Sequence, residues 1–182
     1  MKITVYCSSV ENLPEQWQLS AKLVGRWIGE HKAQLVYGGV NAGLMTILAQ
    51  ACKDAGGTVV GVVPQRRIDR ASPLNDVRVP ASDLNDRKGV MQLLGDVFVV
   101  LPGGYGTFDE FATSFSYINF NLLRDKRIII YNADGLYDHL LAQLQTFVDR
   151  GLMNVDRLDI LKVVNSPEEI VITLDRLAKE IK

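Results

Sequence analysis

The feature that most constrains the fold is a regular alternation of short β-branched runs with longer segments of helical periodicity. In residues 14–30, for example, apolar side chains recur about every 3.6 positions. Repeated strand–helix alternation predicts right-handed crossovers and a parallel sheet with helices on both faces. We therefore expect an α/β protein, a Rossmann-like three-layer sandwich with a mainly parallel sheet, built as one domain over residues 1–182.

The expected strands are 3–7, 34–38, 58–64, 77–79, 96–102, 127–131 and 160–164. The expected helices are 14–30, 43–55, 83–94, one from about 108, 136–149, and a last one that begins at Pro167 with Ser166 as its N-cap. Residues 65–76 read QRRIDRASPLND and are expected to form a polar loop.

Charge and composition argue against several classes of protein. The formal net charge is −1, so the chain has no global basic field to attract nucleic acid or an anionic membrane surface. The N-terminus enters a strand-like run without a signal peptide, and no apolar run reaches the roughly 18 residues of a membrane span. We expect a cytoplasmic protein that binds neither nucleic acid nor membrane.

Cysteine and histidine usage indicates neither a disulfide framework nor a metal centre. Cys7 and Cys52 lie far apart and outside any C-x-x-C motif, so we expect free thiols. His31 and His139 are isolated, without the neighbouring ligands that a zinc site needs. The sequence therefore predicts no metal and no cofactor.

Three turns that follow predicted strands carry the residue types of an anion site. Ser8 and Ser9 follow the first strand, residues 38–43 read GGVNAG, and residues 102–107 read PGGYGT. Ligands of parallel α/β sheets bind beyond the carboxyl ends of the strands. Glycine lets the backbone approach a ligand, and a helix N-terminus offers free N–H groups to an anion. Each glycine turn alone could be only a tight connection, but together with the serines they favour one phosphate site.

The spacing within these turns argues against two common nucleotide sites. Gly38 and Gly43 have the spacing of a P-loop, but Leu44 and Met45 follow where lysine and a hydroxyl residue belong, so a triphosphate hydrolase is disfavoured. Neither turn contains G-x-G-x-x-G, because Asp109 stands where the third glycine belongs, and this disfavours an ordinary NAD site.

Two charged residues near the second glycine turn admit both a structural and a functional interpretation. Thr107 and Glu110 form T-x-x-E, a capping box in which Thr107 would cap the helix and Glu110 would bond the N-cap N–H. Arg87 shares a predicted helix face with Leu84 and Met91, where an unpaired guanidinium would be unfavourable. We therefore expect Arg87 to have a carboxylate or phosphate partner.

Taken together, these motifs resemble the Lonely Guy (LOG) family of cytokinin riboside 5′-monophosphate phosphoribohydrolases, long labelled lysine decarboxylases. The resemblance covers residues 3 to about 131. It rests on P-G-G-x-G-T-x-x-E at 102–110, the R-K pair at 87–88, YCSS at 6–9, YGG-x-x-x-GLM at 37–45 and GVVP at 61–64.

The resemblance implies hydrolysis of the N-glycosidic bond of an adenine-type nucleoside 5′-monophosphate to free base and ribose 5-phosphate, with Arg87 and Glu110 as the catalytic pair. It also implies a homodimer in which each active site is completed by the partner; Trp17, Trp27 and the apolar helix at 43–51 could supply the contact surface or belong to an ordinary core. The implied substrate-binding residues are Ser8, Ser9, Gly39, Gly43, Met45, Lys88, Gly103, Gly104, Tyr105, Gly106, Thr107 and Ser116.

The sequence departs from the family pattern at three positions. The glycine of Y-C-G-S-S is absent at residues 6–9, Asn85 stands where the histidine of M-H-x-R-K belongs, and Thr46 replaces a usual glycine. These departures leave the preferred base open between N6-modified adenine, adenine and another base. The alternative functions are a non-catalytic carrier of nucleotides or the molybdenum cofactor, a pyridoxal-phosphate decarboxylase that would need Lys88 as its Schiff-base lysine, and a DNA-associated nucleotide-binding domain.

Overall fold

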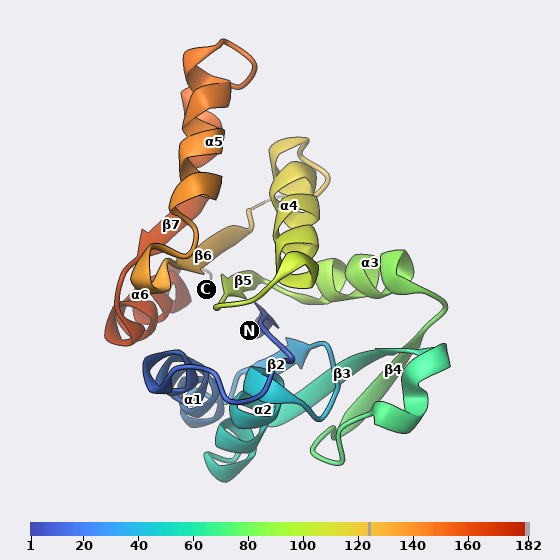
Figure 1. The fold of residues 1–182 in the computed structure, drawn as a ribbon. Helices are drawn as coiled ribbons and strands as arrows, with labels where there is room; N and C mark the ends of the chain where they lie inside the picture. Colours follow the sequence, from blue (N-terminus) through green and yellow to red (C-terminus); the bar gives the residue numbers. More distant parts are fainter. Residues whose placement is uncertain (124, 181–182) are drawn as a thin grey trace.

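The computed structural model describes residues 1–123 and 125–180 and has a seven-stranded sheet in the order β4-β3-β2-β1-β5-β6-β7, in which every strand pair is parallel (Figure 1). The expected Rossmann-like α/β fold is therefore confirmed. The strands are β1 (Lys2–Tyr6), β2 (Gln34–Tyr37), β3 (Thr58–Pro64), β4 (Val77–Ala81), β5 (Val97–Val100), β6 (Arg127–Tyr131) and β7 (Leu161–Val164).

The helices lie on both faces of the sheet. They are α1 (Glu15–Glu30), α2 (Gly43–Asp54), α3 (Leu84–Leu94), α4 (Tyr105–Asn119), α5 (Asp138–Asp149) and α6 (Pro167–Glu180), with 3-10 turns η1 (Gln65–Arg70), η2 (Ala133–Gly135) and η3 (Val155–Leu158). Ser166 Oγ accepts a hydrogen bond from Glu169 N at 3.3 Å, so the predicted cap of α6 is confirmed.

The strand period of two divides the interior into two cores. In β5, Val97 and Val99 pack with α1, α2 and α6, while Phe98 and Val100 pack with α3, α4 and α5. Each strand residue in the centre of the sheet is therefore buried on one side or the other. This explains why β5 and β6 read as continuous apolar runs rather than alternating ones.

Helices α1 and α2 pack backbone to backbone because α1 carries two glycines one turn apart. A Cβ on Gly29 would lie 2.5 Å from Ala55 Cβ and 2.7 Å from Cys52 O, and a Cβ on Gly25 would overlap Leu48 O. Trp27 is buried in the core on this face, and Trp17 packs against it. The two tryptophans therefore serve the chain's own core.

The direction in which strands are added to the sheet reverses between β1 and β5. From β1 the chain adds β2, β3 and β4 on one side, and then β5, β6 and β7 on the other. Such a switch point opens a crevice beyond the carboxyl ends of its two strands. Because β2, β1 and β5 are neighbours, the turns after these three strands meet at one edge, as the sequence predicted.

Three details differ from the sequence-based expectations. Helix α4 begins at Tyr105 and not near 108, because Gly104 takes an extended conformation at the N-cap and the helix starts directly after the turn. Strand β4 continues through Pro80, which an edge strand tolerates. Leu84 is 60% exposed and does not share the buried face of Met91. Cys7 and Cys52 are free and buried, and no helix among the described residues is long and apolar enough to cross a membrane.

Candidate active site

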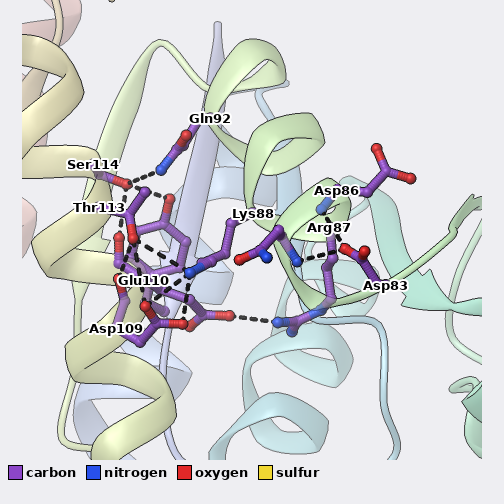
Figure 2. Close-up of polar contacts among 11 residues, drawn as sticks. Asp83, Asp86, Arg87, Lys88, Gln92, Asp109, Glu110, Thr113 and Ser114 are labelled. Atoms are coloured by element: carbon purple, nitrogen blue, oxygen red, sulfur yellow. Dashed lines mark hydrogen bonds and ion pairs between the residues drawn. The ribbon is translucent and has the colours of Figure 1, made fainter.

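The centre of the candidate site is a buried ion pair between helices α3 and α4. Arg87 Nη1 donates to Glu110 Oε1 at 2.6 Å, and the two side chains are only 11% and 7% exposed (Figure 2). The pair connects two segments 23 residues apart in sequence, and it places a carboxylate at the rim of the sheet. The partner expected for Arg87 is therefore present, and it is a carboxylate.

This pair replaces the capping box that the local sequence favoured. The N-cap of α4 is Gly104, which has no side chain, and Thr107 is already the third residue of the helix. Glu110 therefore lies on the second turn and its carboxylate bonds Arg87 instead of an N-cap N–H. The prediction of a Thr107–Glu110 capping box was wrong, because the extended Gly104 lets the helix start earlier than T-x-x-E implies.

The guanidinium of Arg87 is held at two further places. Its Nε donates to Val62 O at 3.0 Å, near the end of β3. A side chain on Gly38 would overlap Arg87 Nη2, so the guanidinium lies directly on the backbone at the end of β2. Since a carbonyl, a carboxylate and a glycine constrain it together, Arg87 is a rigidly placed cation.

Burial raises the pKa of Glu110 above its ordinary value. The loss of solvation is the largest cause, and the charge and hydrogen bond of Arg87 oppose it, with smaller contributions from Asp109 and Lys88. A carboxylate of this kind can take up a proton closer to neutral pH than a surface glutamate. Such shifts are common where a carboxyl group does acid–base chemistry.

A second ion pair lies beside the first, also between α3 and α4. Lys88 Nζ donates to both oxygens of Asp109 at 2.8 Å and lies 3.4 Å from Thr113 Oγ1 (Figure 2). The lysine side chain is 12% exposed, and its charge is matched by Asp109. Lys88, which the family resemblance assigns to substrate binding, is thus held by a neighbour on the facing helix.

A buried polar network supports α4 behind Glu110. Ser114 Oγ donates to Glu110 O at 2.8 Å, shares a 2.8 Å hydrogen bond with the hydroxyl of Tyr6, and accepts from Gln92 Nε2 at 3.2 Å. These four residues come from β1, α3 and α4, so the network ties the helix that carries Glu110 to the strand and helix beside it. Fully bonded polar networks of this kind give a buried region one arrangement.

The N-terminus of α4 is an open donor site. Among the hydrogen bonds of the described residues, none uses the N–H groups of Gly104, Tyr105, Gly106 and Thr107. A Cβ added at Gly104 or at Gly106 would meet nothing within 4 Å. Neither glycine has a positive φ, so neither packing nor backbone geometry explains them. The space that they leave, at the positive end of a helix dipole, suits an anion.

The other glycine turn is largely filled by the chain itself. Gly43 N donates to Glu11 Oε1 at 2.8 Å, and Leu44 N donates to Ser8 O at 3.0 Å, so two donors at the start of α2 are already used. Gly39 and Gly43 have φ values of +71° and +51°. The conformation of the turn itself therefore requires glycine at both positions.

The remaining predicted site residues lie at different distances from the ion pair. Ser8 is buried and its hydroxyl accepts from Val10 N at 3.0 Å, whereas Ser9 is exposed. Met45 lies beside Gly38, and therefore close to Arg87.

The predicted residues on α4 differ in exposure. Thr107 is buried next to Gly103, while Tyr105 is 94% exposed. Ser116 lies two turns further along α4 than Glu110 and lines the groove between α4 and α5, away from the rim.

Several contacts that shape the site were not predicted from the sequence. Gly38 makes room for Arg87, Val62 O binds it, Asp109 pairs with Lys88, and Glu11 covers the start of α2. The R-K and D-E dipeptides at 87–88 and 109–110 could have suggested two ion pairs between facing helices, although Arg87 pairs with Glu110, 23 residues away, and Lys88 with Asp109, 21 residues away. The acceptor of the Arg87 Nε hydrogen bond is the backbone carbonyl of Val62, so no residue type in the sequence could have indicated this contact.

Comparison with protein families and curated proteins gives one consistent result. Residues 45–174 match the family described as possible lysine decarboxylase. The chain is 31% identical over 182 residues to the cytokinin riboside 5′-monophosphate phosphoribohydrolase LOG of Oryza sativa subsp. japonica, covering 98% of this chain and 74% of the rice protein. It is also 31% identical to a cytokinin riboside 5′-monophosphate phosphoribohydrolase of Arabidopsis thaliana, covering 97% of this chain and 83% of that protein.

Solved structures with a similar fold include proteins that bind the molybdenum cofactor. The molybdenum cofactor binding protein of Rippkaea orientalis aligns with a TM-score of 0.76 at 23% identity, covering 97% of this chain and 96% of that one. The molybdenum cofactor carrier protein of Chlamydomonas reinhardtii also gives a TM-score of 0.76, at 20% identity and 98% coverage of both chains. At these identities the likeness concerns the fold alone.

Proposed function

We propose that this chain, which belongs to the Lonely Guy (LOG) family, hydrolyses the N-glycosidic bond of adenine-type nucleoside 5′-monophosphates to free base and ribose 5-phosphate. The observation that carries the proposal is the buried Arg87–Glu110 pair, which lies one turn along α4 from four N–H groups that bond none of the residues the structure describes. In such a substrate the phosphate and the reacting carbon, C1′, belong to the same ribose 5-phosphate unit and therefore lie close together. A donor site and a carboxylate that follow each other on one helix match that arrangement.

The 5′-phosphate is assigned to the N-terminus of α4. There the N–H groups of residues 104–107 and the helix dipole would bind it, with the space left by Gly104 and Gly106 admitting its oxygens. Gly103 belongs to the same turn and lets the Thr107 side chain pack beneath it. This contact uses backbone groups, so it fixes the nucleotide without requiring another charged side chain.

Glu110 is assigned the chemical role. Loss of the base leaves positive charge on the ribose, and an adjacent carboxylate stabilises that charge while it orients or deprotonates the attacking water. Arg87 holds this carboxylate in one orientation and keeps part of its population ionised, because its positive charge lowers the pKa that burial raises. Met45, beside Arg87, and the turn that holds Gly39 and Gly43 would then line the nucleoside side of the pocket.

The direct test is release of free base. Purified protein is incubated with AMP and, separately, with N6-isopentenyl-AMP, and adenine or the modified base is quantified by chromatography. The wild type should release base, and Glu110→Gln should release little, because glutamine can still accept the hydrogen bond from Arg87 but carries no charge. Glu30→Gln, which removes one exposed carboxylate on α1, is the matched control and should behave as the wild type.

A nucleotide or molybdenum-cofactor carrier is the second candidate, since an open helix N-terminus would also bind the phosphate of a carried ligand. A carrier has no need of a buried carboxylate beside the sugar. It would be the better account if AMP raised the melting temperature of the protein but neither nucleotide released base.

The proposal includes a homodimer with shared active sites. A groove of about 660 Å³ lies between α4 and α5 and is lined mainly by apolar side chains. Phe120 and Leu152 are each 75% exposed on it, and Phe108, two residues before Glu110, stands at its start. In Figure 1, α4 and α5 extend side by side from the sheet. A second copy docked here would bury this apolar surface and reach the active site, and Ser116 would then lie at the interface.

A further inference from the structure

The segment between β3 and β4 concentrates positive charge at the rim of the sheet. Its 3-10 turn, η1, reads QRRIDR, and its three arginines against Asp69 leave a formal charge of +2 in a chain whose net charge is −1. Arg66, Arg67 and Arg70 are all exposed. Among the described residues, none of the three makes a side-chain hydrogen bond or ion pair. The nearest downstream acid, Asp76, is engaged by Lys53 and by Val59 N.

Backbone contacts hold η1 against the candidate site. Asn41 N donates to Arg70 O at 3.3 Å, and Ser72 N donates to Gly39 O at 2.7 Å. Asn75 Nδ2 also donates to Gly39 O, at 3.0 Å. The turn that follows β2 and the segment that contains η1 are thus joined. Moreover, η1 directly follows β3, whose Val62 O accepts a hydrogen bond from Arg87.

The order of the strands places η1 on the base side of a bound nucleotide. The phosphate site follows β5, the Arg87–Glu110 pair reaches from α4 to the ends of β2 and β3, and η1 follows β3. These strands are neighbours in the order β3-β2-β1-β5, so the two ends of the line are three strand spacings apart, on the order of 14 Å. A nucleotide with its phosphate at α4 and its glycosidic bond at Glu110 directs its base toward η1.

We propose that the three arginines of η1 recognise an anionic group on the base side of the substrate, so that the enzyme prefers a nucleoside 5′-monophosphate whose base carries a carboxylate over one with an apolar N6 tail. This inference rests on the proposed function for the direction of the nucleotide. Arginine binds carboxylates with paired, charge-assisted hydrogen bonds. An apolar tail would instead remove the guanidinium groups from water without giving them new hydrogen bonds. Within η1, Ile68 is the one aliphatic side chain that could pack against such a tail.

Three nucleotides separate the possibilities: AMP, N6-isopentenyl-AMP and N6-succinyl-AMP, whose N6 substituent carries two carboxylates. Their dissociation constants are measured by calorimetry on Glu110→Gln, which removes turnover, and kcat/KM for base release is measured on the otherwise wild-type chain. The test variant is Arg66→Gln/Arg67→Gln/Arg70→Gln. The matched control is Lys22→Gln/Arg26→Gln/Arg176→Gln, which removes the same number of exposed positive charges from α1 and α6.

We expect N6-succinyl-AMP to bind most tightly, and the η1 variant to weaken it roughly tenfold or more while changing AMP affinity by less than about threefold. The control should change neither. The inference is overturned if the η1 variant binds N6-succinyl-AMP as tightly as the parent, or if it weakens all three nucleotides equally, since the arginines would then act on the fold or on the 5′-phosphate. If arginine-dependent binding is found but no nucleotide releases base, the inference stands and the proposed hydrolysis fails.

Discussion

At the scale of single residues, Glu110 combines burial with one opposing cation, and this predicts the pH dependence of the reaction. Burial raises its pKa, and the proposed chemistry needs the ionised carboxylate. The value of kcat/KM should therefore fall on the acid side with an inflection above the ordinary glutamate pKa of about 4.3. A pH profile of base release from AMP checks this. An inflection at or below the ordinary value would show that Glu110 is not the titrating group.

The same pKa shift makes a prediction about stability. A raised folded-state pKa means that the folded chain binds this proton more tightly than the unfolded chain, so the stabilising contribution is complete below the unfolded pKa and is lost as the pH rises through the folded one. Relative to Glu110→Gln, the melting temperature of the wild type should fall as the pH rises from the ordinary glutamate pKa of about 4.3 toward neutrality and above. Thermal unfolding of both proteins across that range measures the difference, and parallel curves would contradict it.

Arg87 opposes the effect of burial on Glu110, so its removal should move the pKa of Glu110 further upward. Arg87→Met is expected to shift the acid limb of kcat/KM to higher pH, because a buried carboxylate without its cation protonates more readily. It should also lower the plateau roughly 10²- to 10⁴-fold, because Glu110 loses the hydrogen bond that orients it. Arg87→Lys keeps the charge but cannot span Val62 O and Glu110 as the guanidinium does. It should therefore show a smaller shift, with most of the loss in kcat.

The pair of Lys88 and Asp109 is predicted to position Glu110 rather than to bind phosphate. Lys88→Met and Asp109→Asn should each lower kcat several-fold with little change in KM for AMP, and the double variant should be no worse than either single one. A phosphate contact by Lys88 would give another pattern: a large rise in KM for Lys88→Met and none for Asp109→Asn. Steady-state kinetics of the three variants decide between these outcomes.

At the scale of elements, Gly38 connects the end of β2 to the orientation of Arg87. A methyl group there would occupy the position of Arg87 Nη2, and the flexible arginine would move away before the backbone did. Gly38→Ala should therefore reduce kcat by an order of magnitude or more while the melting temperature changes little. Loss of stability in proportion to activity would show instead that the strand end itself had been disturbed.

Helices α1 and α2 depend on small residues for their close approach, and this is testable by stability alone. Gly29→Ala places a Cβ 2.5 Å from Ala55 Cβ and should destabilise the fold by about 1–3 kcal/mol in urea unfolding. Gly89→Ala in α3 is the matched control, since a Cβ there meets nothing within 4 Å. It should stabilise the protein by about 0.4–1 kcal/mol, because alanine has less backbone freedom to lose on folding.

At the scale of the whole molecule, the groove between α4 and α5 predicts the oligomeric state. We expect a dimer by sedimentation or light scattering, and Leu152→Glu should yield monomers with reduced base release, because a charge would be buried in the apolar contact. Ile172→Glu, on α6 and also exposed, should remain a dimer with normal activity. A wild-type monomer with full activity would contradict the proposal of shared sites.

The success of sequence-based interpretation differed between parts of the molecule for physical reasons. Strands such as 127–131 and the last helix, which begins at Pro167 after its cap Ser166, were predicted well because strand periodicity and helix caps are local properties. The start of α4 was not, because T-x-x-E is also compatible with a helix that begins two residues before Thr107. The expected burial of Arg87 predicted that it has a partner, but it did not identify that partner as Glu110. The contact joins two helices that only the tertiary fold brings together.

The amino-acid sequence by itself determined the alternation of strands and helices, the parallel sheet, and the place of the functional turns at its carboxyl edge. These follow from periodicity, glycine positions and chain connectivity, which are properties of the sequence order alone. Only the tertiary structure decided which glycine turn stays open. Glu11 and Ser8 use the donors at the start of α2, while those at the start of α4 have no partner within the part of the chain that the structure describes. That difference depends on side chains and carbonyls brought from distant strands and loops, so no local pattern contains it.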